Sequence, residues 1–140
     1  MGRYYRPTVF QSLWHKIDDL IADQRIFATE EVQIEIERKA DHLVRWCRER
    51  KEMFISVDEQ IQPVVSEILT LHGRLVKALS NRSAADPFVI ALAKLRKAIV
   101  VTGERPSGSL DKPKIPDVCD AIGISCMSLL EMMEAEGWSF

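Results

Sequence analysis

The chain has 140 residues, a formal net charge of −2 and a pI of about 5.9, with 46% hydrophobic and 29% charged residues. This composition excludes a disordered or fibrous protein. A chain of this length buries roughly 68% of its unfolded surface, so we expect one domain, residues 1–140, around a single core. The slightly acidic balance does not exclude nucleic-acid binding, because basic residues can gather on one face.

The sequence shows no sign of secretion or membrane insertion. No apolar run approaches the roughly 18 residues that span a bilayer, and the two arginines in residues 1–6 are followed by no apolar segment. Cys47, Cys119 and Cys126 are odd in number and form no Cys-x-x-Cys pair. We therefore expect reduced, buried thiols in a cytoplasmic protein.

Hydrophobic periodicity predicts two helices and one short strand in the first half of the chain. Thr29 is a suitable N-cap for the second helix, whose first turn holds Glu30 and Glu31, and we expect a break in it near Ala40 or Asp41. The strand is apolar and β-favouring, which is typical of a strand buried on both faces. The predicted elements are a helix over 12–23, a helix over 30–51 and a strand over 53–57.

The second half of the chain alternates helices with short apolar strands. Gly73 weakens its first helix locally, residues 80–83 predict a polar turn, and residues 103–113 predict a loop rich in Gly, Pro, Ser and charge. No buried strand is predicted in the first ten residues. The predicted elements are helices from 59 or 63 to 78, from 84 or 86 to 97, over 116–123 and over 129–135, and strands over 99–102 and 124–127.

This alternation predicts an α/β protein with a parallel or largely parallel sheet covered by helices on both sides. In such a sheet ligands bind beyond the C-terminal ends of the strands, where acids can hold a divalent cation. Asp86 opens a helix and Glu104 follows the strand over 99–102, so we expect both carboxylates at one end of the sheet. The pattern favours a metal-dependent phosphodiesterase.

Each candidate acid also has a structural interpretation. Asp86 precedes a proline and an apolar helix, the pattern of an N-cap, although a carboxylate can cap a helix and bind a metal together. Glu104 can be a solvated loop acid. Glu35 has the spacing of an exposed ion-pair ladder with Glu31 and Lys39.

Basic residues follow the last acid in the sequence. Arg105, Lys112 and Lys114 have a solvated surface as their usual explanation, but beside acids they can bind phosphates. The histidines lack metal-ligand spacing, which leaves little support for zinc. No P-loop, nucleophile elbow or dinucleotide fingerprint is present, which argues against ATP hydrolysis, acyl transfer and hydride transfer.

Three segments together resemble the second half of a PIN-like domain, from a bacterial branch similar to the VapC toxins. They are residues 85–93, 99–104 and 114–119. The resemblance extends over nearly the whole chain through Arg3-Tyr4-Tyr5, Phe10, Trp14 and Glu30–Glu37. It implies a three-layer α/β/α sandwich with a mostly parallel sheet and a ribonuclease activity that depends on Mg²⁺ or Mn²⁺.

The resemblance also assigns roles to individual residues. It implies that Glu35, Asp86 and Glu104 are catalytic metal ligands, that Thr102 supports them, and that Arg105, Lys112 and Lys114 bind RNA phosphates. The family's first acid lies at the end of an N-terminal strand that this chain starts too late to contain. We therefore expect an N-terminally shortened domain without the first strand, explained by an upstream start codon, by a partner that fills the gap or by an inactive truncated product.

These expectations lead to two hypotheses about function. The first is a metal-dependent endoribonuclease that acts as the toxin of a type II toxin–antitoxin pair, with RNA as substrate, a cognate antitoxin as partner and a homodimer as a common state. The second is a catalytically incomplete PIN-like module that binds a cognate antitoxin or another protein. An unrelated α/β domain is the third explanation that the sequence leaves open.

Overall fold

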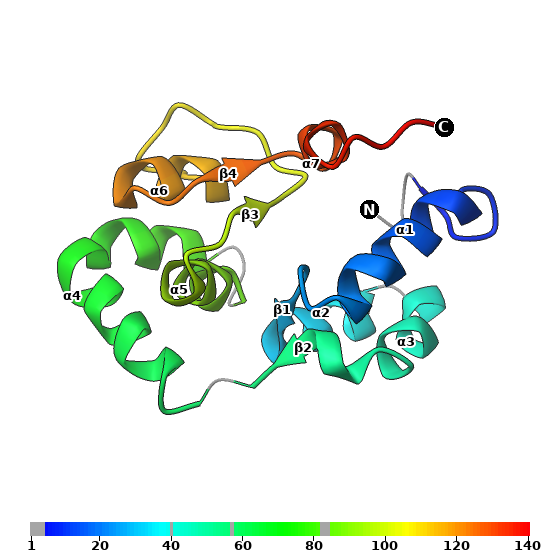
Figure 1. The fold of residues 1–140 in the computed structure, drawn as a ribbon. Helices are drawn as coiled ribbons and strands as arrows, with labels where there is room; N and C mark the ends of the chain where they lie inside the picture. Colours follow the sequence, from blue (N-terminus) through cyan, green and yellow to red (C-terminus); the bar gives the residue numbers. More distant parts are fainter. Residues whose placement is uncertain (1–4, 40, 57, 82–84) are drawn as a thin grey trace. The chain divides into compact units, whose positions relative to one another are not determined.

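The computed structural model describes residues 5–39, 41–56, 58–81 and 85–140 (Figure 1). Within these residues the protein is mixed α/β, with mainly helical structure and short strands. Its residue contacts divide into two units, residues 1–56 with Phe140 and residues 57–139. We describe each unit by itself.

The first unit contains helices around a short parallel strand pair. Strand β1 pairs with β2 so that Ala28 lies opposite Phe54 and Thr29 lies opposite Ile55. Helices α2 and α3 form the connection between the two strands, because parallel strands need a long crossover. The described elements are α1 (Gln11–Ala22), β1 (Ala28–Thr29), α2 (Glu30–Lys39), α3 (Asp41–Arg48), the 3₁₀ turn η1 (Lys51–Met53) and β2 (Phe54–Ile55).

Helix α1 matches the predicted helix over 12–23, because its apolar residues recur with helical spacing and all lie on the buried face. The buried residues are Leu13, Trp14, Ile17, Leu20 and Ile21. Strand β2 is shorter than predicted, with Phe54 buried and Ile55 half-buried, and Val57 lies outside the described residues. The predicted break near Ala40 or Asp41 stays a prediction, because α2 is described to Lys39 and α3 from Asp41, and Ala40 lies outside the described residues.

Strand β1 has no counterpart in the sequence prediction. It is two residues long, which is too short to show the alternation that identifies a strand. Thr29 is fully buried in this strand, and its hydroxyl accepts a hydrogen bond from the backbone N–H of Val32, at 3.4 Å. The same residue therefore ends a strand and begins α2, and the sequence shows only its capping role.

The second unit contains a long helix pair and a second parallel strand pair. Helix α4 packs against α5, and α6 connects β3 to β4, with Val100 opposite Cys126 and Val101 opposite Met127. The described elements are α4 (Ile61–Ser80), α5 (Asp86–Arg96), β3 (Val100–Val101), α6 (Ile115–Ile122), β4 (Cys126–Met127) and α7 (Leu129–Ala135).

The helix boundaries of the second unit follow local rules. Helix α4 has non-helical backbone at His72, next to the predicted weak point at Gly73. Helix α5 ends in left-handed backbone at Lys97, and α6 ends at Gly123 with φ +85°, a conformation that glycine adopts without strain. Helix α7 begins with the capping box of Ser128 and Glu131, and it matches the predicted range.

The coarse fold prediction is confirmed, since the protein is mixed α/β and both strand pairs are parallel. In the described part of the chain the strands form two separate two-stranded sheets. The predicted polar turn overlaps the end of α4, and residues 82–84 lie outside the described residues. None of the described helices is both long enough and apolar enough to cross a membrane.

Candidate functional site

Asp86 is the first residue of α5, and its exposed fraction is only 8%. The structure assigns the N-cap to Ala85, whose carbonyl accepts the backbone N–H groups of Phe88 and Val89, so the N-cap interpretation of Asp86 is wrong. Pro87 follows at the second helical position. The carboxylate of Asp86 lies in the first helical turn, where the helix dipole favours negative charge.

Glu104 follows strand β3 and contacts the start of α6. Its backbone N–H donates to the Thr102 hydroxyl at 3.1 Å, and its Oε2 accepts the backbone N–H of Ile115 at 2.9 Å. Glu104 is half-buried. It is therefore a loop acid whose carboxylate also caps the first N–H group of α6.

Glu35 belongs to the first unit, whereas Asp86 and Glu104 belong to the second. Glu35 is half-buried on α2. On the same helix the side-chain amide of Gln33 donates a hydrogen bond to the Glu37 carboxylate at 3.2 Å. The convergence of the three acids stays a prediction.

The donor chemistry of the predicted acids fits Mg²⁺, which prefers carboxylate oxygens. One oxygen of Glu104 already accepts the Ile115 N–H, but a carboxylate has further lone pairs for a cation. Over residues 5–39, 41–56, 58–81 and 85–140, no three or more His, Cys, Asp and Glu side chains form a group that can hold a metal ion. The predicted acids therefore have the donor chemistry of Mg²⁺ ligands, and their assembly into one site stays a prediction.

The predicted phosphate-binding residues lie in and beside the loop after β3. Arg105 and Lys112 are exposed, and Lys114 is half-buried at the N-cap of α6. The loop between them is fixed by Asp117, a residue that sequence reasoning did not single out as functional. Its carboxylate accepts the Ser107 N–H and hydroxyl at 2.9 Å each, the Gly108 N–H at 3.2 Å and the Lys114 N–H at 2.8 Å.

These contacts keep Asp117 ionised. Burial acts to raise the pKa of Asp117, but hydrogen bonds from Ser107, Lys114 and Gly108 outweigh it and lower the pKa to about 2. The contact between Asp117 and the Lys114 N–H has a signal in the sequence. Asp117 is at the third position of the helix, where an acidic side chain commonly accepts the backbone N–H of the N-cap residue. The contacts across the loop were not visible, because they join residues about ten positions apart.

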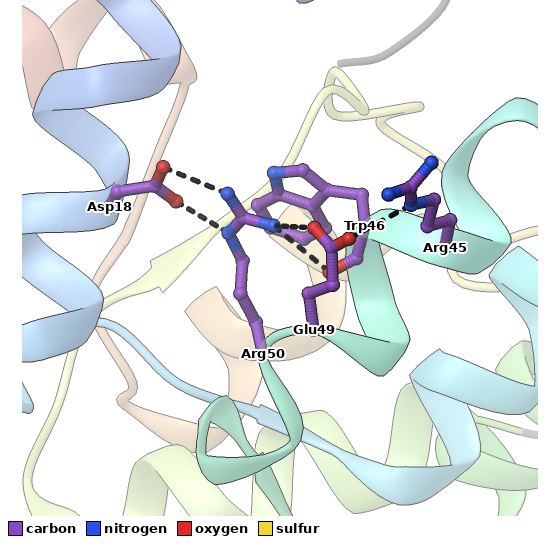
Figure 2. Close-up of polar contacts among 5 residues, drawn as sticks. All are labelled: Asp18, Arg45, Trp46, Glu49 and Arg50. Atoms are coloured by element: carbon purple, nitrogen blue, oxygen red, sulfur yellow. Dashed lines mark hydrogen bonds and ion pairs between the residues drawn. The ribbon is translucent and has the colours of Figure 1, made fainter.

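A second polar cluster lies in the first unit (Figure 2). Arg50 donates two hydrogen bonds to the carboxylate of Asp18 on α1, at 2.5 and 2.8 Å, and a third to the Trp46 carbonyl at 3.1 Å. Its guanidinium also lies over the Trp46 ring, 4.5 Å from the centroid, and Trp46 packs edge-on against Trp14. Hydrogen bonding to Asp18 raises the pKa of Arg50, so this cation is permanent.

A shallow surface hollow of about 300 Å³ lies beside this cluster. It is lined by Asp18, Ile21, Ala22, Glu49, Arg50 and Glu52. The guanidinium in it is already paired with Asp18, and the hollow holds none of the predicted site residues. The cluster therefore joins α1 to the end of α3 and is an element of structure.

Comparison with known proteins gives a family but no activity. The family model described as Domain of unknown function (DUF4411) matches residues 1–140. The chain belongs to the DUF4411 family. No curated protein and no solved structure is significantly similar to it. For this DUF4411 member, the PIN-like resemblance stays a prediction.

Proposed function

We propose that this chain is a metal-dependent endoribonuclease with a PIN-like three-layer sandwich, and that it acts as the toxin of a type II toxin–antitoxin pair. The observation that carries the proposal is the burial of Asp86 at the start of α5, a helix that contacts β3. Aspartate is rarely buried in folded proteins, and ionisable groups in buried environments cluster at catalytic and binding sites. Glu104, just beyond β3 in the same unit, is the second acid of the proposed site.

The proposed roles follow from the chemistry of the side chains. Glu35, Asp86 and Glu104 hold the cation, Mg²⁺ or Mn²⁺, which when bound supplies an activated water and stabilises the leaving oxygen. The Thr102 hydroxyl fixes the turn that carries Glu104, because it accepts the Glu104 backbone N–H. The exposed Arg105 and Lys112, together with Lys114, bind the RNA backbone.

The direct test is RNA cleavage in Mg²⁺ and in EDTA by the wild type and by Asp86→Asn and Glu104→Gln. We expect each substitution to lower the rate by about 100-fold or more, since even outer partners of metal ligands cost about 10–100-fold. Glutamine keeps an oxygen that can accept the Ile115 N–H, so Glu104→Gln preserves the helix-end contact. The exposed Asp120 on α6 gives the matched control, Asp120→Asn.

The control is expected to cleave RNA like the wild type. If both site variants do so as well, the proposed site is wrong. Activity that persists unchanged in EDTA contradicts the metal requirement.

The second candidate function is a catalytically incomplete PIN-like module that binds a cognate antitoxin or another protein. Two observations favour it: Glu104 already accepts the first N–H of α6, and the described residues hold no group of three metal-binding side chains. The module is expected to form a stable complex with a small DNA-binding protein encoded next to it while leaving RNA intact. A pull-down from the native host that recovers no such protein counts against the antitoxin partner in both proposals.

A further inference from the structure

The loop between β3 and α6 is held by one carboxylate from the helix that follows it. Asp117 contacts the middle of the loop at Ser107 and Gly108, and its end at Lys114. Three of these contacts are made by backbone N–H groups of the loop, so they fix the path of the chain whatever rotamers the loop side chains adopt. A carboxylate that accepts several N–H groups makes charge-assisted hydrogen bonds, which are stronger than neutral ones.

Two serine hydroxyls extend this network through the rest of the loop. Ser107 Oγ accepts the backbone N–H of Ser109 at 3.1 Å, and Ser109 Oγ accepts those of Asp111 and Lys112 at 3.2 and 3.4 Å. The Ser107 hydroxyl is also the one that donates to Asp117. The backbone N–H of Lys112 is thus fixed through Ser109, and that of Lys114 is fixed by Asp117 itself.

We infer that Asp117 is a positioning residue that holds Arg105, Lys112 and Lys114 as a preformed binding surface for the phosphodiester backbone of the RNA substrate. This inference rests on the proposed nuclease function and deepens it. Phosphate contacts fix the register of a nucleic acid on a protein, so their value depends on where the cations are held. A loop that is ordered before binding loses less conformational entropy when RNA binds.

The direction in which one substitution changes RNA affinity distinguishes a positioning role from a simple effect of charge. Asp117 is an anion that contacts the segment carrying the three cations, so on electrostatics alone its removal strengthens the binding of a polyanion. Positioning predicts the opposite result, because the loop loses the carboxylate that orders it. Asp111 is the matched control, since it is an exposed acid in the same loop whose substitution removes the same charge.

The experiment measures the affinity of Asp117→Asn, Asp111→Asn and wild-type protein for a short fluorescein-labelled single-stranded RNA, in EDTA and over a range of salt concentrations. We expect Asp117→Asn to bind about tenfold more weakly, the loss of about one charge-assisted contact, and Asp111→Asn to bind as well as the wild type or better. Substituting Arg105, Lys112 and Lys114 together by Gln is expected to reduce the salt slope by about 2, at about 0.7 for each phosphate contact.

A second pair of variants tests the loop without touching Asp117 or any charge. Gly108 has φ +72° and Gly137 has φ +70°, and an added Cβ meets no heavy atom within 4 Å at either position. Gly108→Ala therefore strains the backbone of the loop, while Gly137→Ala applies the same strain outside it. We expect the first to weaken RNA binding and the second to leave it unchanged.

The outcomes distinguish this inference from the function on which it rests. Wild-type protein that neither binds nor cleaves RNA overturns the proposed function and the positioning role together. If the wild type binds and cleaves RNA while Asp117→Asn matches Asp111→Asn in affinity, and Gly108→Ala matches Gly137→Ala, only the positioning role is overturned. In cleavage assays, a positioning role requires Asp117→Asn to raise KM with little change in kcat, because it weakens the binding of RNA rather than the reaction.

Discussion

At the residue scale, the carboxylate of Asp117 and the three thiols have environments that change their ionisation in opposite ways. Asp117 accepts hydrogen bonds that favour its charged form. Cys119 is fully buried and Cys47 is buried as well, so desolvation disfavours their thiolates. Both effects are measurable on the wild-type protein.

The first prediction concerns the pH dependence of the loop. Because the pKa of Asp117 is lowered from 3.8 to about 2 in the folded protein, its contribution to stability is present above pH 3.8 and is lost as the pH falls toward 2. We expect the amide resonances of Ser107, Gly108 and Lys114 to shift together with a midpoint near pH 2. NMR titration checks this, and a shared midpoint at pH 3.8 or above contradicts the observed contacts.

The second prediction concerns thiol reactivity. Burial raises the pKa of Cys119 to about 12, with a further contribution from the neighbouring Cys126, and burial also raises the pKa values of Cys126 and Cys47. At pH 8 the thiolate fraction of Cys119 falls by about 1000-fold relative to a thiol at its ordinary value, and the thiolate is the nucleophile. We expect the native protein to react slowly with Ellman's reagent and the unfolded chain to react fast at all three cysteines.

The unfolded chain is the control for that measurement, because it shares every thiol with the native state. Rapid modification of native Cys119, located by mass spectrometry, rules out the buried environment described for α6.

At the element scale, contacts between helices decide which substitutions matter. In the first unit, Arg50 joins α1 to the end of α3 through Asp18 and Trp46, and its side chain is 20% exposed. Arg45 pairs with Glu49 one helical turn away, but its side chain is 91% exposed. In the second unit the contact between α4 and α5 buries Leu79 and Ile90 completely.

The third prediction compares the two arginines of the first unit. Arg50→Ala is expected to lower the free energy of unfolding by about 1–2 kcal/mol, because it removes a forked ion pair and a cation–π contact that are only partly solvated. Arg50→Lys keeps the charge but not the planar fork, so we expect it to restore only part of that loss. Arg45→Ala is the matched control, with an expected effect below about 0.5 kcal/mol.

Urea unfolding of the three variants supplies the measurement. If Arg50→Ala and Arg45→Ala lower the free energy of unfolding equally, the partly buried ion pair of Arg50 stabilises the protein no more than an exposed pair does.

The fourth prediction concerns the core of the second unit. Ile90 is 0% exposed on α5, so Ile90→Ala is expected to cost about 2–4 kcal/mol through lost burial and a residual cavity. Leu71 on α4 is 63% exposed, and Leu71→Ala is expected to change the free energy of unfolding by about 0.5 kcal/mol or less. Thermal or urea unfolding distinguishes the two, and similar losses contradict the assignment of the buried face of this helix pair.

At the scale of the whole molecule, the proposed function requires acids from both units to bind one cation. Glu35 belongs to the first unit and Asp86 and Glu104 to the second, and the PIN-like resemblance predicts that they act together. Each unit by itself contains only part of the predicted ligand set.

The fifth prediction tests each proposed ligand by the increase in melting temperature that the cation causes. A cation that binds only the folded state adds about 1.4 kcal/mol at a concentration about ten times its Kd. We expect Mg²⁺ or Mn²⁺ to raise the melting temperature of the wild type, and Glu35→Gln, Asp86→Asn and Glu104→Gln each to reduce that shift. Asp120→Asn is the control, and a full shift in Glu35→Gln removes Glu35 from the ligand set.

The sequence alone located the helices and the ends of several of them. Hydrophobic periodicity located α1 and α5, and the predicted ranges of α6 and α7 agree with ends that the structure caps locally, at Gly123 and Ser128. It also determined the strands β2, β3 and β4 to within a few residues, since each is a short apolar run.

Tertiary structure decided what depends on pairing between distant residues. Strand β1 exists because Ala28 and Thr29 find β2 about 26 positions later, and nothing local marks it. The contact of Arg50 with Asp18 and that of Asp117 with Ser107 likewise join separate segments. Periodicity and capping describe neighbours in sequence, whereas the partner of a charged side chain is chosen by which segments the fold brings within hydrogen-bonding distance.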